Sequence, residues 1–225
     1  MTNQAKQPLN PETPSDRPKD QSGKHLKRRY ITATLLLLSF AVGLGSGFLL
    51  WGRQAHCGET QSSNQPELGP PDAPITIIEF SDFTCGYCRK FHLETFNQLL
   101  DTYPDQIRFI YRNFPVVGGF EAALASLCAG EQGKYWEYHD LLFTGDLAMG
   151  RSAYLQYAEE LGLDTEALSE CIDSGRFAYQ VEADYTYARS MGISGTPSFL
   201  INGIPVIGAQ PLEVFIQIID AELNK

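Results

Sequence analysis

The chain has 225 residues, 43% of them hydrophobic, which is enough for one ordinary domain with a substantial core plus accessory segments, whereas two full-size domains would be crowded. Its formal net charge of −10 is unevenly distributed, because residues 1–30 carry seven Lys and Arg against three acids and residues 54–225 are strongly acidic. Such an acidic domain repels phosphate, so the charge argues against nucleic acid as a partner.

Residues 1–30 are rich in Pro, Gln, Lys and Asp and have almost no large apolar side chains, which predicts a disordered segment. Residues 31–52 follow a basic cluster and contain no charge over a length that can cross a bilayer as a helix. The cationic flank before this run and Trp51 near its end indicate a single transmembrane signal-anchor, with the N-terminus in the cytoplasm and the remainder outside.

Two alternatives to a retained anchor remain open. A cleaved secretory signal normally has a shorter apolar core and a small-x-small cleavage site, and here the small residues of 43–47 fall inside the apolar run. A lipoprotein would need small residues just before Cys57, where Gln54-Ala55-His56 fits poorly. In each case we expect the domain to be exported, to a compartment where cysteines are oxidised or redox-active.

After a polar linker at 53–71, residues 72–225 are expected to form one folded domain. The run 75–80 is nearly continuous in apolar and β-branched residues, which is typical of a central strand covered on both faces. An amphipathic helix is expected from about Cys85 to Leu100, and residues 107–111 predict a second strand. These elements make a βαβ unit whose helix begins at a C-x-x-C pair.

The C-x-x-C pair, Cys85 and Cys88, is the strongest chemical signal in the chain. A helix N-terminus offers unpaired N–H groups and the positive end of the helix dipole, which bias a cysteine in its first turn towards thiolate. Thiolate is the form that attacks disulfides. Cys88, one turn later, can close a small ring and release whatever Cys85 has captured, so the pair predicts thiol–disulfide exchange.

A zinc site is the alternative for these cysteines. Zinc needs about four ligands, and Cys128 and Cys171 are isolated from each other in the sequence rather than forming a second paired motif. His92, four residues after Cys88, shares a helix face with it, but a closed set still requires a ligand from elsewhere. We therefore predict neither a metal ion nor another cofactor, and expect His92 to be structural.

Residues 120–191 change to a helical period and predict an inserted helical subdomain of four or five helices, at 122–130, 135–143, 153–161, 164–172 and 177–191. Strands return at 198–201 and 204–207, joined by the hairpin signal Asn202-Gly203. A final helix is expected from Pro211, at its first position, to about Leu223.

Cys128 and Cys171 both lie on predicted helices of the insertion. In an oxidising compartment two such cysteines in one small subdomain favour a structural disulfide, with two separate buried thiols as the alternative. Cys57 is left over, either free or paired with another molecule.

The order of strand, C-x-x-C helix, strand, helices, Thr196-Pro197, hairpin and final helix resembles the thioredoxin fold, and more closely the DsbA-like proteins that carry a helical insertion. Three motifs support the resemblance over roughly residues 68–223, namely the stretches 79–88, 132–139 and 194–199. It implies an α/β thioredoxin-like fold on the extracytoplasmic side of a bacterial cytoplasmic (inner) membrane, facing the periplasm.

The resemblance also implies roles for individual residues. Cys85 becomes the nucleophile, Cys88 the resolving cysteine, and Pro197 a cis proline beside the disulfide. The backbone edge at Thr196 and Pro197 would then pair with an extended substrate like an added strand. Glu79 lies in a strand otherwise destined for the core, and if buried beneath Cys88 its pKa would rise and it would exchange the Cys88 proton; the alternative is that it tips outward at the strand end.

The two residues between the cysteines, Gly86 and Tyr87, help to set how oxidising such a protein is. They lack the histidine of the strongest oxidants of the resembled family, and the negative charge of Asp82 should also disfavour the Cys85 thiolate. We therefore expect an intermediate redox potential.

The leading hypothesis is a membrane-anchored oxidase that introduces disulfides into reduced exported proteins and is reoxidised by a membrane-embedded partner, near which the tether keeps it concentrated. The alternative within the same chemistry is a disulfide isomerase or reductase, since Cys-Gly-Tyr-Cys with Thr196 before the proline resembles bacterial isomerases. Those isomerases dimerise through an added N-terminal domain, for which the linker is too short and polar. A redox-inert binding module is a third hypothesis, against which the intact Cys85 and Cys88 argue.

Overall fold

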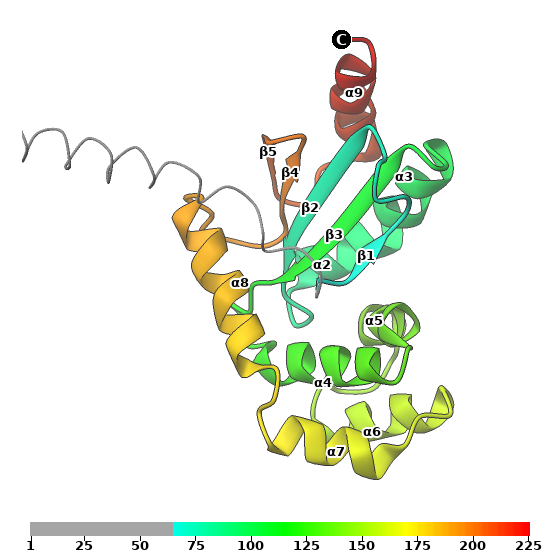
Figure 1. Ribbon diagram of the computed structural model, residues 1–225, viewed down its shortest axis with the longest axis vertical. Helices are drawn as coiled ribbons and strands as arrows, with labels where there is room; N and C mark the ends of the chain where they lie inside the picture. Colours follow the sequence, from blue (N-terminus) through cyan, green and yellow to red (C-terminus); the bar gives the residue numbers. More distant parts are fainter. Residues whose placement is uncertain (1–64) are drawn as a thin grey trace, which may run out of the picture. The chain divides into compact units, whose positions relative to one another are not determined.

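The computed structural model describes residues 65–225, which fold around a five-stranded sheet in the order β1-β3-β2-β4-β5 (Figure 1). The two central strands, β2 (Ile75–Ser81) and β3 (Ile107–Asn113), are parallel. The strands outside them, β1 (Glu67–Leu68), β4 (Ser198–Ile201) and β5 (Ile204–Ile207), pair antiparallel with their neighbours. The α/β architecture with an inserted helical subdomain is the predicted one.

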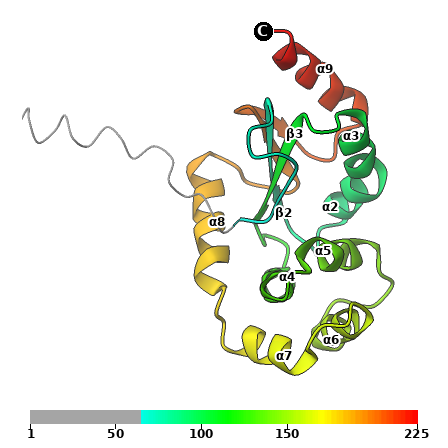
Figure 2. The same ribbon diagram turned by 45° about the vertical axis from the view of Figure 1, so that its right-hand side comes forward.

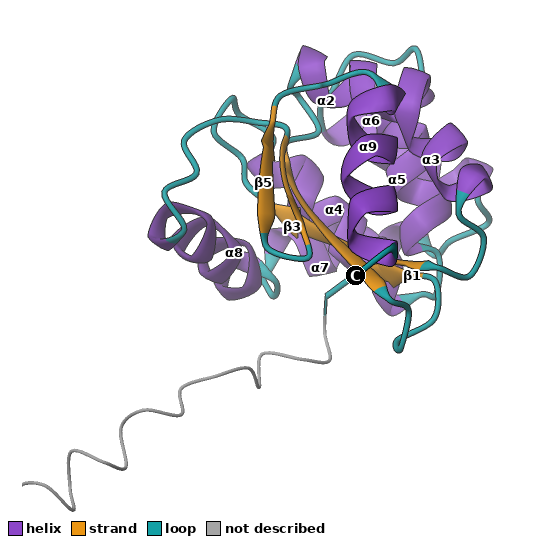
Figure 3. Cartoon of the chain, turned by 90° about the horizontal axis from the view of Figure 1, so that it is seen from above, coloured by secondary structure: helices purple, strands orange, loops and turns teal. Residues whose placement is uncertain are grey.

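Strand β2 is largely apolar because helices cover both faces of the sheet (Figure 3). Ile75 and Ile77 pack on the side of α2 (Gly86–Phe91), α3 (Asn97–Thr102) and α9 (Leu212–Leu223). Phe80 points to the opposite face, where it packs with Ala188 of α8 (Ala178–Ser190). Successive side chains of β2 thus point to opposite faces of the sheet and pack into two separate hydrophobic cores.

The helix that begins after Cys85 is continuous in space but not uniform. Between α2 and α3 the segment η1 (His92–Phe96) has π-helical hydrogen bonding. Phe91, at the end of α2, packs on Phe199 of β4 and Phe215 of α9, with ring centroids 4.5 and 5.4 Å apart. Full burial of such a side chain contributes about 2–3 kcal/mol, so these contacts fix the active-site helix on the sheet.

The insertion between β3 and β4 contains α4 (Phe120–Glu131), α5 (Tyr135–Thr144), α6 (Arg151–Glu160), α7 (Thr165–Asp173) and α8. Helices α4 to α7 lie beyond one end of the sheet, whereas α8 runs back along its face (Figure 2). A buried ion pair between Arg112 of β3 and Asp184 of α8, 2.9 Å apart, ties that helix to the sheet. Arg112 also lies over the ring of Tyr187, 4.4 Å from its centroid.

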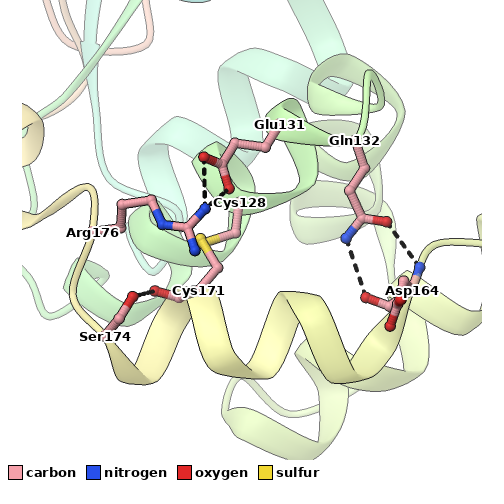
Figure 4. A network of polar contacts seen from close by, with 7 residues as sticks. All are labelled: Cys128, Glu131, Gln132, Asp164, Cys171, Ser174 and Arg176. Atoms are coloured by element: carbon pink, nitrogen blue, oxygen red, sulfur yellow. Dashed lines mark hydrogen bonds and ion pairs between the residues drawn. A yellow bond between two sulfur atoms is a disulfide. The ribbon is translucent and has the colours of Figure 1, made fainter.

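Helices α4 and α7 are joined by a disulfide between Cys128 and Cys171, the pair expected from the sequence (Figure 4). Both cysteines are buried in the core of the insertion. Polar contacts flank the disulfide, since Arg176 pairs with Glu131 at 2.6 Å and the side chain of Gln132 exchanges two hydrogen bonds with the backbone of Asp164. The disulfide and the polar contacts beside it therefore hold this part of the inserted helical subdomain together.

The C-terminal hairpin turns at Asn202 and Gly203, whose φ values of 46° and 84° are those that the predicted hairpin turn requires. Pro211 caps α9 instead of occupying its first helical position. Strand β1 lies in a stretch assigned to the linker by the sequence pattern, and it pairs with β3 at the sheet edge.

The predicted disordered segment 1–30, the anchor at 31–52, most of the linker and Cys57 lie outside the described residues. Within residues 65–225 no helix has the length and apolar character needed to cross a membrane.

Candidate active site

Cys85 is the N-cap residue of α2, with an extended backbone at the point where β2 and a short turn deliver the chain to the helix. Its amide donates to the carbonyl oxygen of Asp82 at 2.9 Å, which closes that turn. Cys85 is 7% exposed and Cys88 is fully buried. Both are unpaired thiols in this structure. The intervening Gly86 and Tyr87 are at the surface, so an incoming sulfur can reach Cys85 but not Cys88.

The two sulfurs differ strongly in acidity. A hydrogen bond from the Cys88 thiol, helped by Thr196 and by the amides of Tyr87 and Cys88, lowers the pKa of Cys85 to about 5 against the effect of burial. Burial raises the pKa of Cys88, and the hydrogen bond to Cys85 and the charge of Glu79 raise it further. At neutral pH the reduced pair therefore holds one thiolate, on Cys85, and one thiol, on Cys88.

The loop before β4 lies against Cys85. The Thr196–Pro197 peptide bond is cis, and the carbonyl oxygen of Thr196 lies 3.4 Å from the Cys85 sulfur, which donates to it when the thiol is protonated. The loop is held in place because the Ser198 hydroxyl donates to the Gly195 carbonyl at 2.7 Å and the Gly208 amide donates to the Pro197 carbonyl at 2.9 Å. The structure thus brings together Cys85 and the Thr196–Pro197 loop, which lie 111 residues apart in the sequence.

Glu79 lies within β2 and is 3% exposed, so the alternative in which it tips outward does not hold. Burial raises its pKa to about 8, opposed by the nearby Ser81 hydroxyl and reinforced by the charge of Cys85. The carboxyl group is consequently mostly protonated at neutral pH. Its charge, when present, raises the pKa of Cys88, so the two side chains interact electrostatically.

The carboxylate of Asp82, whose charge was expected to disfavour the Cys85 thiolate, binds a neighbouring loop. Its two carboxylate oxygens accept from the amide and hydroxyl of Thr84 and from the amides of Val117, Gly118 and Gly119, at 2.6 to 3.2 Å. A Cβ on Gly119 would lie 2.2 Å from one of these oxygens, so glycine is required there. Asp82 ties the loop 117–119 to the active-site turn, and the groups that set the pKa of Cys85 are Cys88, Thr196 and the helix amides.

Among the described residues, His92 groups with His139 and Asp140 as possible metal ligands. Its ring lies 5.1 Å from that of His139, and its Nε2 is 3.6 Å from an oxygen of Asp140. Burial lowers the pKa of His92 to about 4, with the neighbouring His139 as the next cause. These three residues offer ligand atoms within 4.8 Å of one another, which could hold a metal ion only with further ligands from solvent.

Comparisons with known proteins agree with this geometry. A family model described as Thioredoxin matches residues 61–221. The chain is 35% identical over 139 residues to Na(+)/H(+) antiporter NhaA 3 of Salinispora tropica, covering 60% of this chain but only 21% of that relative. It is 30% identical over 172 residues to Disulfide bond formation protein D of Bacillus subtilis, covering 67% of this chain and 73% of the relative.

Two solved structures are similar over most of the described residues. A thioredoxin-like oxidoreductase from Silicibacter pomeroyi has a TM-score of 0.67 and 31% identity, with 73% of this chain and 95% of that one covered. Wolbachia pipientis alpha-DsbA1 has a TM-score of 0.65 and 26% identity, with 71% and 91% covered. The chain therefore belongs to the thioredoxin family, as a DsbA-like thiol–disulfide oxidoreductase.

Proposed function

We propose that this protein works outside the cytoplasm as an oxidase, passing a Cys85–Cys88 disulfide to reduced exported proteins. The observation that carries the proposal is the position of Cys85 at the N-terminus of α2, with its sulfur 3.4 Å from the Thr196 carbonyl oxygen; these surroundings lower its pKa to about 5 and stabilise the thiolate of the reduced protein. Lowering a thiol pKa from 9 to 5 stabilises the reduced form at pH 7 by about 3 kcal/mol, or about 60 mV in the oxidising direction. A disulfide whose reduced form is stabilised is an oxidant.

The exchange begins with a client thiolate, which attacks the sulfur of Cys85 because Cys88 is buried. The client–Cys85 bond forms, the Cys85–Cys88 bond breaks, and its electron pair goes to Cys88. The protonated Glu79 carboxyl gives its proton to Cys88. The second client thiolate then attacks the client sulfur of the mixed disulfide, and Cys85 leaves as a thiolate. The client has lost two electrons, which the reduced pair now holds.

An extended client segment fits the backbone edge at Thr196 and Pro197. The Thr196 carbonyl oxygen is 3.4 Å from the Cys85 sulfur, so a segment paired along this edge would carry its cysteine to the reacting atom. Tyr87 is 69% exposed beside Cys85, and Val117 is 61% exposed on the loop that Asp82 ties to the active-site turn. These side chains would give the client apolar contacts.

The proposed setting is the outer side of a bacterial cytoplasmic membrane. The uncharged run 31–52 supports a membrane anchor, and the Cys128–Cys171 disulfide suits an oxidising compartment. Reoxidation by a membrane-embedded partner completes the cycle, and the anchor would keep the domain concentrated near that partner.

Two clients test the proposal, one fully reduced and one with scrambled disulfides. Rapid oxidation of the first with little rescue of the second is the expected result. The opposite pattern would identify an isomerase. The Gly86-Tyr87 pair and Thr196 are the sequence features that favour that alternative. A protein that oxidises neither client, and in which Cys88→Ala traps no mixed disulfide, would be a binding module.

A further inference from the structure

Strands β2 and β3 present a line of buried polar side chains beneath the cysteines. Their parallel register places Glu79 opposite Tyr111, and Ser81, two residues beyond Glu79, projects from the same face of the sheet. Glu79, Ser81 and Tyr111 are 3%, 1% and 0% exposed. Asn113, opposite Ser81 and 1% exposed, lies on the same face, so four polar side chains share one buried face in strands that are otherwise largely apolar.

The Ser81 hydroxyl lies at the centre of this group. It is close enough to Glu79, Cys88 and Tyr111 to lower the pKa of each of them. Burial raises the pKa of Tyr111 well above its usual value, and the charges of Glu79 and Cys88 add to this effect. The carboxyl, the two hydroxyls and the resolving thiol are therefore near enough to affect one another.

The two hydroxyls have spare hydrogen-bonding capacity. Within the part of the chain that the structure describes, neither the Ser81 nor the Tyr111 hydroxyl makes a hydrogen bond of normal geometry. Packing alone does not need the phenol oxygen, since the ring of Tyr111 stacks on Phe83 at 5.3 Å and meets His139 edge-on at 4.9 Å, contacts that phenylalanine would keep. A buried hydroxyl without a partner is costly, and a partner that forms during the reaction would offset that cost.

We propose that Ser81 and Tyr111 are positioning residues for the proton of Cys88, because their hydroxyls donate to the Glu79 carboxylate that forms once Glu79 has protonated that sulfur. The proposal rests on the role of Glu79 in the proposed function. In this step the Glu79 O–H bond breaks and the Cys88 S–H bond forms. The hydroxyl protons stay on their oxygens and only reorient, so no further reactant is required. On reoxidation the same carboxylate takes the proton back.

The test is a pH titration of Glu79 in the full chain, monitored by carbon NMR of a protein labelled at the glutamate side-chain carboxyls. The Glu79 signal is assigned as the one that is absent in Glu79→Gln. Removing either hydroxyl, by Tyr111→Phe or Ser81→Ala, removes a donor to the carboxylate. Each variant should therefore raise the pKa of Glu79 by about one unit. Tyr138→Phe is the matched control, since it deletes another buried phenol oxygen, one that donates to the Tyr154 carbonyl at 2.8 Å within the insertion. It should leave the Glu79 titration unchanged.

A second readout is the single-turnover rate of client oxidation by the oxidised protein as a function of pH. Tyr111→Phe and Ser81→Ala should slow the step about 3- to 10-fold, because Glu79 becomes a weaker acid. An unchanged Glu79 titration in both variants, or a shift no larger than that of Tyr138→Phe, overturns the positioning role while leaving the proposed function intact. A wild-type rate for Glu79→Gln would instead remove the proton role of Glu79 and this proposal with it.

Discussion

The molecule contains two cysteine pairs that lie in contrasting surroundings. Cys128 and Cys171 face each other from two helices and are buried on all sides in the core of the insertion, joined as a disulfide. Cys85 and Cys88 lie on one helix turn, with one sulfur reachable and stabilised as a thiolate and the other buried as a thiol. Access and acidity, not the presence of two cysteines, separate a structural pair from a reactive one.

The largest effect should come from the reactive pair itself. Cys85→Ser should abolish exchange, whereas Cys88→Ala should accumulate mixed disulfides with clients because the buried sulfur that releases them is gone. Mass spectrometry of non-reduced complexes measures both outcomes. If Cys85→Ala were the trap and Cys88→Ser the dead variant, the roles of the two sulfurs would be reversed.

Glu79→Gln should change how the stability of the protein depends on pH, because it removes the buried carboxyl beside the reactive pair. The folded pKa of Glu79, about 8, lies above its unfolded value near 4.5, so unfolding favours ionisation and stability is lost as pH rises between these values. Glutamine removes this loss, and the oxidised variant should be more stable than wild type by on the order of 3–5 kcal/mol at pH 9 and equally stable at pH 4. Urea unfolding at both pH values measures the difference. A variant less stable than wild type at pH 9 would contradict the burial argument.

The structural pair should matter for stability and not for chemistry. Removing both Cys128 and Cys171 by substitution with Ala opens a disulfide that spans 43 residues, which should cost about 2–4 kcal/mol in denaturant unfolding. The double variant should retain client oxidation at a temperature where it remains folded. Loss of oxidation in the folded variant would show that the two pairs are coupled.

Asp82→Ala should give a smaller effect. Five donors to the carboxylate would lose their acceptor, which should destabilise the protein by about 2–3 kcal/mol and loosen the loop 117–119. Since other groups set the acidity of Cys85, thiolate absorbance should titrate with a midpoint near pH 5 as in wild type. A clearly lower midpoint would restore the view that the charge of Asp82 opposes the thiolate.

Local patterns in the sequence predicted most of the framework. The strands 198–201 and 204–207 have the expected bounds, because their short apolar runs and the Asn202-Gly203 turn between them are decided locally. Cys85 and Cys88 were recognisable because their role depends on the helix start beside them. Strand β1 was missed, since its two residues show no periodicity and are fixed by pairing with β3.

The partners of Asp82 and Tyr111 could not be predicted, because they come together only in the folded chain. Three of the four amides that bind Asp82 lie 35 to 37 residues later, and nothing in the local pattern distinguishes a carboxylate bound by them from a free one. Tyr111 fits a central strand equally well as a core aromatic, and only its register with Glu79 shows where its hydroxyl lies. The Gly118-Gly119 pair was the available signal for a tight loop at this site.

The central claim is that a stabilised Cys85 thiolate makes the Cys85–Cys88 disulfide an oxidant. Equilibration of the full chain with reduced and oxidised glutathione tests it most directly, with the fraction of each form read after acid trapping and alkylation. We expect a reduction potential of the Cys85–Cys88 pair between about −200 and −120 mV, in the range of oxidising members of the thioredoxin superfamily. A potential near about −270 mV, that of the reductant thioredoxin, would contradict it.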